Sequence, residues 1–117
     1  MRFDAPAPFE GSFVEYTDRW KVKERREFFE LEGDEYLALL GKKIMALRIE
    51  VEGDEPITQA SELTPDRYEA VDGRLWDWFR ATPLAALEET MRLGEAMRLQ
   101  LFRLPETAAS ADTPNPS

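Results

Sequence analysis

The sequence of 117 residues contains no histidine and no cysteine. Without histidine the chain lacks the commonest general base, and without cysteine it lacks the best side-chain nucleophile and any disulfide. These two residue types are also the usual ligands of transition metals. Their absence argues against most hydrolytic, redox and zinc chemistry. We therefore expect a protein that is not an enzyme and that needs no cofactor.

Long apolar runs are also missing. The longest uninterrupted one, Tyr36 to Leu40, is far shorter than the roughly 20 residues that cross a bilayer. The N-terminus has no apolar run of the signal-peptide kind. The formal net charge is −9, from 24 acidic and 15 basic residues, and such a surface repels nucleic acid and anionic membranes. The sequence predicts a soluble intracellular protein that binds neither.

Aromatic residues, in contrast, are plentiful, with three Trp, seven Phe and three Tyr. Aromatic side chains dominate both protein cores and protein interfaces. Apolar residues make up 43% of the chain and charged residues 33%, which is typical of a globular domain. The composition therefore favours a globular protein that binds other proteins.

The patterning predicts a mainly α fold, a small four-helix domain over residues 12–104. Residues 1–11 are expected to be a flexible arm. Residues 105–117 are expected to be a disordered tail, because Pro105 stops the last helix and no large apolar residue follows it. The four helices are predicted over residues 21–32, 34–47, 65–81 and 83–104.

Two segments carry helix-start signals. Thr64 is followed by Pro65 and Asp66, so it supplies a capping oxygen before a proline at the first helical position. Thr82 and Pro83 repeat this signal, which predicts that the third helix ends near Ala81.

One short strand is expected over residues 12–17, where aromatic and β-branched residues gather. A strand needs a partner, and the other strand-like stretch is the alternation at Leu47, Ile49 and Val51. Whether the two segments pair is left open by the sequence.

The candidate binding residues are apolar side chains that lie off the helix faces expected to pack in the single core. Trp76 and Trp78 point about 200° apart on a helix, so if Trp78 packs in the core, Trp76 faces outward as a hot-spot anchor. The last helix already has an inner stripe that includes Met91, Met97 and Leu101. Further apolar residues broaden that stripe and imply a second contact. The predicted partner-binding residues are Trp20, Trp76, Leu93, Leu99 and Phe102.

A basic cluster beside Trp20 leaves alternatives open. Its members are Arg19, Lys21, Lys23, Arg25 and Arg26. They could form a solvated helix face, contact phosphates or meet an acidic patch on a protein partner. The acidic excess also admits an inhibitor that mimics the charge of DNA, although here acids and bases alternate along the chain.

The stretch from Phe13 to Leu104 resembles the tail assembly chaperones of long-tailed bacteriophages in the order of its features. A β-like opening (FVEYTDRW) precedes a charged helix with an aromatic pair (KERREFF). A Glu-Gly-Asp-Glu-Tyr-Leu-x-Leu-Leu helix, a Lys-Lys-Ile segment and a Gly-x-x-Pro-Ile turn come next. A Leu-Thr-Pro-Asp helix start and a Trp-rich helix ending before Thr-Pro-Leu complete the pattern.

The resemblance implies a chaperone that works in the cytoplasm of the bacterial host and is absent from the mature virion. Such proteins coat the hydrophobic tape measure protein and help to recruit tail tube subunits. Self-association would also use the spare apolar surface. The family has no catalytic residues to transfer to this chain. A structural head–tail adaptor of the phage particle is the alternative.

Overall fold

The computed structural model describes residues 1–108, with side chains as far as Phe102. Two compact units are present: the first spans Met1–Leu87, and the second begins at Glu88. The single domain expected over residues 12–104 is thus divided within the last helix. Most of the predicted disordered tail, residues 109–117, lies outside the described residues.

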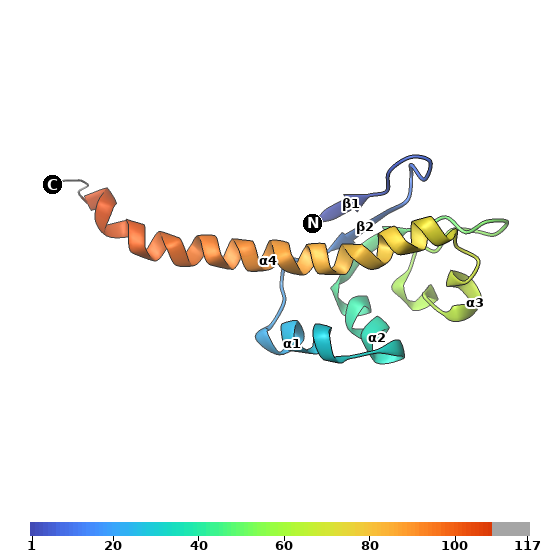
Figure 1. Ribbon diagram of the computed structural model, residues 1–117, viewed down its shortest axis with the longest axis horizontal. Coiled ribbons are helices and arrows are strands. Elements are labelled where there is room, and N and C mark those ends of the chain that lie inside the picture. Colours follow the sequence, from blue (N-terminus) through green and yellow to red (C-terminus); the bar gives the residue numbers. More distant parts are fainter. Residues whose placement is uncertain (109–117) are drawn as a thin grey trace. The chain divides into compact units, whose positions relative to one another are not determined.

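The first unit contains a three-stranded antiparallel sheet in the order β1-β2-β3 (Figure 1). The strands are β1 (Arg2–Asp4), β2 (Phe13–Tyr16) and β3 (Ile44–Arg48). β2 confirms the strand expected over residues 12–17, and its Val14 pairs with Leu47 of β3. The pairing that the sequence left open is therefore present, although β3 begins earlier than the alternation suggested. Ile49 forms an isolated bridge with Ile57 instead.

The expectation of a flexible N-terminal arm is wrong for its first residues. β1 pairs with β2 along its length, with Phe3 opposite Val14. The Ala5 N–H donates to the Ser12 carbonyl at 3.0 Å, and Ala5 is buried in the core. The arm carries too few apolar residues to suggest a strand by itself, and its order comes from the edge that β2 offers.

Four α-helices accompany the sheet in the described part of the chain: α1 (Val22–Glu30), α2 (Gly33–Lys43), α3 (Pro65–Tyr68) and α4 (Gly73–Ala108). A short 3₁₀ helix covers Ala60–Glu62. The fold is therefore mixed α and β, and the predicted four-helix domain is only partly correct. The predicted second helix continued to residue 47, whereas α2 ends at Lys43 because the following residues enter the sheet as β3.

The start of the Trp-rich helix is displaced from the predicted position. Thr64 precedes only the single turn of α3, and its side chain makes no capping hydrogen bond. α4 begins at Gly73, and the Asp72 carboxylate accepts a hydrogen bond from the Arg74 backbone N–H at 2.8 Å. Hydrogen bonds from the Arg74 side chain and backbone lower the pKa of Asp72. Asp72 therefore caps the helix that was expected to begin at Thr64.

Thr82 and Pro83 do not separate two helices, because α4 runs through both. Pro83 has no N–H to donate to the Phe79 carbonyl, the acceptor one turn earlier. The Thr82 hydroxyl donates to that same carbonyl at 2.7 Å, so the oxygen keeps a partner. Nor does Pro105 stop the helix, which extends to Ala108. The predictions that helices end at Ala81 and at Leu104 are wrong.

The core of the first unit lies between the sheet and the helices. Its fully buried side chains include Val14, Tyr16, Ile49, Ile57, Leu75 and Phe79. A separate small cluster joins Trp20, Leu39 and Leu87. The expected core positions Val71, Leu75 and Phe79 are confirmed as buried.

Candidate protein-interaction surfaces

Three of the predicted partner-binding residues are exposed on the second unit. Leu93 is 40% exposed, Leu99 43% and Phe102 69%. All three lie on the part of α4 that follows Glu88. The structure thus leaves their side chains accessible, as a binding role requires.

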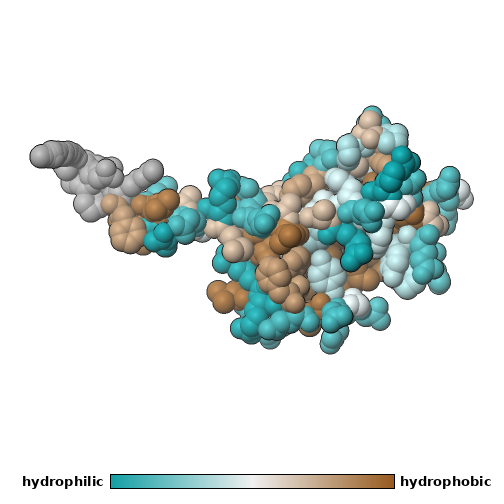
Figure 2. All heavy atoms as spheres, in the orientation of Figure 1, coloured by the Kyte–Doolittle hydropathy of each residue, from teal (hydrophilic) through white to brown (hydrophobic). Residues whose placement is uncertain are grey.

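The supposed inner stripe of this segment is exposed as well, so the expectation that it packs inward is wrong. Met91, Met97 and Leu101 each have at least half of their surface accessible. Together with Leu93, Leu99 and Phe102 they form what we call the α4 apolar surface. Figure 2 shows brown apolar side chains beside teal charged ones along this stretch. The sequence assigned the methionines to a core because helical periodicity does not tell which face has a neighbour.

Charged residues on the same segment pair with one another along the helix. Arg92 bonds to Glu89, and Arg98 bonds to Glu95, with Nε–Oε distances of 3.1 Å in both pairs. These hydrogen bonds lower the pKa values of Glu89 and Glu95. The Arg98 guanidinium also lies 5.8 Å from the Phe102 ring centroid. Four charges around the α4 apolar surface therefore neutralise one another in pairs.

Trp20 is not an exposed anchor. Only 8% of its surface is accessible, and it packs against Leu39, Leu87 and Phe28. Its Nε1 has no hydrogen-bond partner among the described residues. The sequence missed this burial because it depends on Leu39 and Leu87, which are far away along the chain.

The basic cluster lies beside a buried ion pair formed by another lysine. Lys43, the last residue of α2, is buried and donates hydrogen bonds to the Arg19 carbonyl at 3.0 Å and to Glu24 at 2.6 Å. Its ammonium lies 5.6 Å from the Trp20 ring centroid. The hydrogen bond from Lys43 is the main reason that the pKa of Glu24 is lowered. This ion pair fixes the start of α1 against α2.

Trp76 and Trp78 are both half-buried against the core, so the expected division into one inner and one outer Trp is wrong. Trp76 stacks on Tyr68 with ring centroids 4.6 Å apart and on Phe79 at 5.2 Å. One wall of a cavity of about 240 Å³ on the first unit is formed by Trp76. The exposed part of the Trp76 side chain therefore faces this cavity and does not lie on an open helix face.

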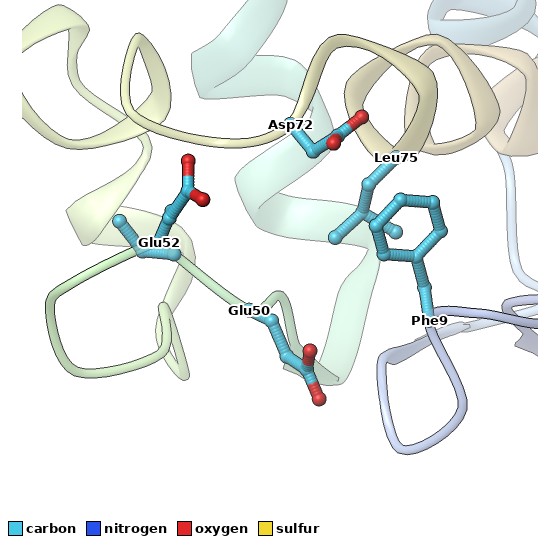
Figure 3. Close-up of a pocket in the computed structure, with 6 residues that line it drawn as sticks. Phe9, Glu50, Glu52, Asp72 and Leu75 are labelled. Carbon is cyan, nitrogen blue, oxygen red and sulfur yellow. The ribbon is translucent and has the colours of Figure 1, made fainter.

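A second cavity of about 200 Å³ is lined by three carboxylates, from Glu50, Glu52 and Asp72. They point in different directions and do not converge on one point, as Figure 3 shows. Asp72 is held by Arg74, and Glu50 lies 3.4 Å from Arg48. Among the described residues, no group of acidic side chains could hold a metal ion. This cavity supplies no evident chemistry.

Comparison with known proteins adds no relative. No family model, no curated protein and no solved structure matches the chain. Within the described residues, none of the helices has the length and apolar character needed to cross a membrane.

Proposed function

We propose that the chain is a non-enzymatic tail assembly chaperone of a long-tailed bacteriophage. It would coat the hydrophobic tape measure protein and help to recruit tail tube subunits in the cytoplasm of the bacterial host. The observation that carries the proposal is the α4 apolar surface, with its six large apolar side chains each at least 40% exposed.

Methionine and leucine suit such a role because their flexible side chains adapt to many apolar surfaces. An amphipathic helix can lay its apolar side along apolar helical stretches of a partner. The tape measure protein is long, so many copies of the chaperone can bind along it and modest individual affinity suffices.

The charge of the chain supports the same role. The net charge of −9 keeps a coated complex dispersed through mutual repulsion. Beside the α4 apolar surface, the pairs Glu89–Arg92 and Glu95–Arg98 neutralise two acids and two arginines. An apolar partner can therefore approach without meeting a strong field, while the rest of the surface maintains solubility.

Co-expression with the tape measure protein of the same phage genome tests the proposal. We expect the tape measure protein to stay soluble and to co-purify with the chain, and we expect purified virions to lack the chain. If virions retain it at a fixed copy number, the structural adaptor is the correct assignment. If the tape measure protein aggregates to the same extent with and without the chain, the chaperone assignment is wrong.

A further inference from the structure

The cavity beside Trp76 is lined mainly by aromatic and apolar side chains. It lies within the first unit, and its volume is about 240 Å³. A cavity of about 150 Å³ in a protein core holds benzene, so this one has room for a large apolar side chain. Its walls come from α2, α3 and the first turns of α4, and they include Tyr36, Leu40, Tyr68, Trp76 and Phe79.

The aromatic wall is held in place by its own packing. Tyr68 and Trp76 stack with an interplanar angle of 12°, and Trp76 stacks on Phe79 at 26°. Phe79 is fully buried and anchors the stack in the core. A wall fixed in this way loses little side-chain freedom when a ligand packs on it, which favours binding.

Arg80 supplies a charge that an aromatic pocket usually lacks. It lines the cavity and is exposed. It forms no ion pair with any residue that the structure describes, as is also true of Arg19, Arg25 and Arg26, whereas Arg74, which lies earlier on α4, is paired with Asp72. A free guanidinium repels a cationic occupant, which aromatic walls would otherwise attract. It favours a carboxylate, which it can bind through two parallel hydrogen bonds.

A second hollow adjoins the first at Arg80. A neighbouring cavity of about 340 Å³ shares Gly33, Tyr36 and Arg80 with the first and adds Leu31 and Glu32. Because the two cavities share three lining residues, a bound segment can extend from one into the other, which favours an extended internal segment. Glu32 lines the second cavity, and its carboxylate would repel further acidic residues of a bound segment. The pocket therefore favours a segment with a single carboxylate, placed beside Arg80.

We propose that this pocket binds an internal segment of another protein in which a large apolar residue lies next to a single Asp or Glu. The apolar side chain enters the aromatic cavity, and the carboxylate pairs with Arg80. The pocket shares no residue with the α4 apolar surface, so the proposal does not depend on the chaperone function.

Selection from a displayed peptide library tests the proposal. Each peptide is seven residues long, with Phe or Leu at its centre and Asp, Asn, Lys or Ala next to it, flanked by Gly and Ser. The immobilised full chain should enrich peptides with Asp beside the apolar residue. Arg80→Gln should weaken the best peptide about tenfold, as expected for a lost charged hydrogen bond. Arg80→Glu should enrich the Lys peptides instead.

Arg26→Gln is the matched control, because Arg26 is an exposed arginine of the same unit that does not line the cavity. It should enrich the same peptides as the unchanged chain. The proposal is overturned if no apolar–acidic peptide is enriched, or if Arg80→Glu leaves the selected peptides unchanged. It is also overturned if added free chain displaces the enriched peptides from the immobilised chain as well as free peptide does. The pocket would then serve self-association.

Discussion

The Tyr16 hydroxyl donates a hydrogen bond to Thr82, with 2.8 Å between the two oxygens of residues 66 positions apart. The direction follows from the second bond of Thr82, whose only hydroxyl proton goes to the Phe79 carbonyl. A buried relay therefore runs from strand β2 through Thr82 to the carbonyl that Pro83 leaves without its helical donor. This relay lets α4 continue through a proline while attaching it to the sheet.

Thr82→Val should destabilise the first unit by about 3 kcal/mol, because it leaves both the Tyr16 hydroxyl and the Phe79 carbonyl buried without a partner. Thr82→Ser keeps the hydroxyl and is the matched control. Chemical denaturation followed by circular dichroism measures the difference. If Thr82→Val were no less stable than Thr82→Ser, the hydroxyl relay would contribute nothing to the stability of the unit.

Alkaline pH should weaken the fold through Tyr16. Burial raises the pKa of Tyr16 above its usual value, while an unfolded tyrosine ionises near pH 10. The unfolded state therefore releases protons first, so the stabilisation is complete below about pH 10 and declines as the pH rises above it. Tyr16→Phe should flatten this decline in a pH series of denaturation curves. If the decline is unchanged in Tyr16→Phe, the loss of stability at alkaline pH comes from Tyr36. Burial raises the pKa of Tyr36 as well.

Asp72→Ala should lower the melting temperature more than Thr64→Ala does. Asp72 accepts a hydrogen bond from the first turn of α4, whereas the Thr64 side chain caps nothing. The pKa of Asp72 is lowered, so its contribution is present above the usual aspartate pKa and is lost as the pH falls through the lowered value. The two variants should therefore converge in acid. The reverse ranking at neutral pH would place the effective cap at Thr64.

Glu24→Gln should cost about 2 kcal/mol, because it removes a hydrogen bond between charged groups and leaves the Lys43 ammonium without its carboxylate in a buried position. Glu27→Gln is the control, since its pair with Lys23 spans 3.9 Å and Lys23 is exposed. That variant should change the free energy of unfolding by well under 1 kcal/mol. Similar losses in both would show that the buried pair stabilises no more than a surface one.

The sequence predicts elements whose signals are local. The aromatic and β-branched run of β2 and the helix formers of α1 were located correctly. The predictions are wrong where contacts with residues far away along the chain determine the local structure. Thr82 and Pro83 look like a helix start, and only Tyr16 and the core reveal them as part of a continuous helix. β1 is ordered by its pairing with β2, which its own composition does not indicate.

The candidate surfaces follow the same rule. Periodicity identified the apolar residues of the last helix, including Leu93, Leu99 and Phe102, but could not decide which of them lack neighbours. Trp20 was placed outside because its packing partners Leu39 and Leu87 come from other elements. The cavity at Trp76 requires three helices to meet, and no local pattern indicates it.

The central claim is that the α4 apolar surface binds the tape measure protein, and a matched pair of double variants tests it most directly. Met97→Ser with Phe102→Ser removes two side chains of that surface, each 69% exposed. Met45→Ser with Phe29→Ser removes the same residue types at 66% and 69% exposure from the first unit. Both should fold, because neither pair belongs to the core.

The measurement is the fraction of tape measure protein that stays soluble when it is co-expressed with each variant. The account predicts that Met97→Ser with Phe102→Ser lowers this fraction severalfold, while Met45→Ser with Phe29→Ser leaves it at the level of the unchanged chain. Equal solubility with both double variants, in chains that melt at the same temperature, would contradict it.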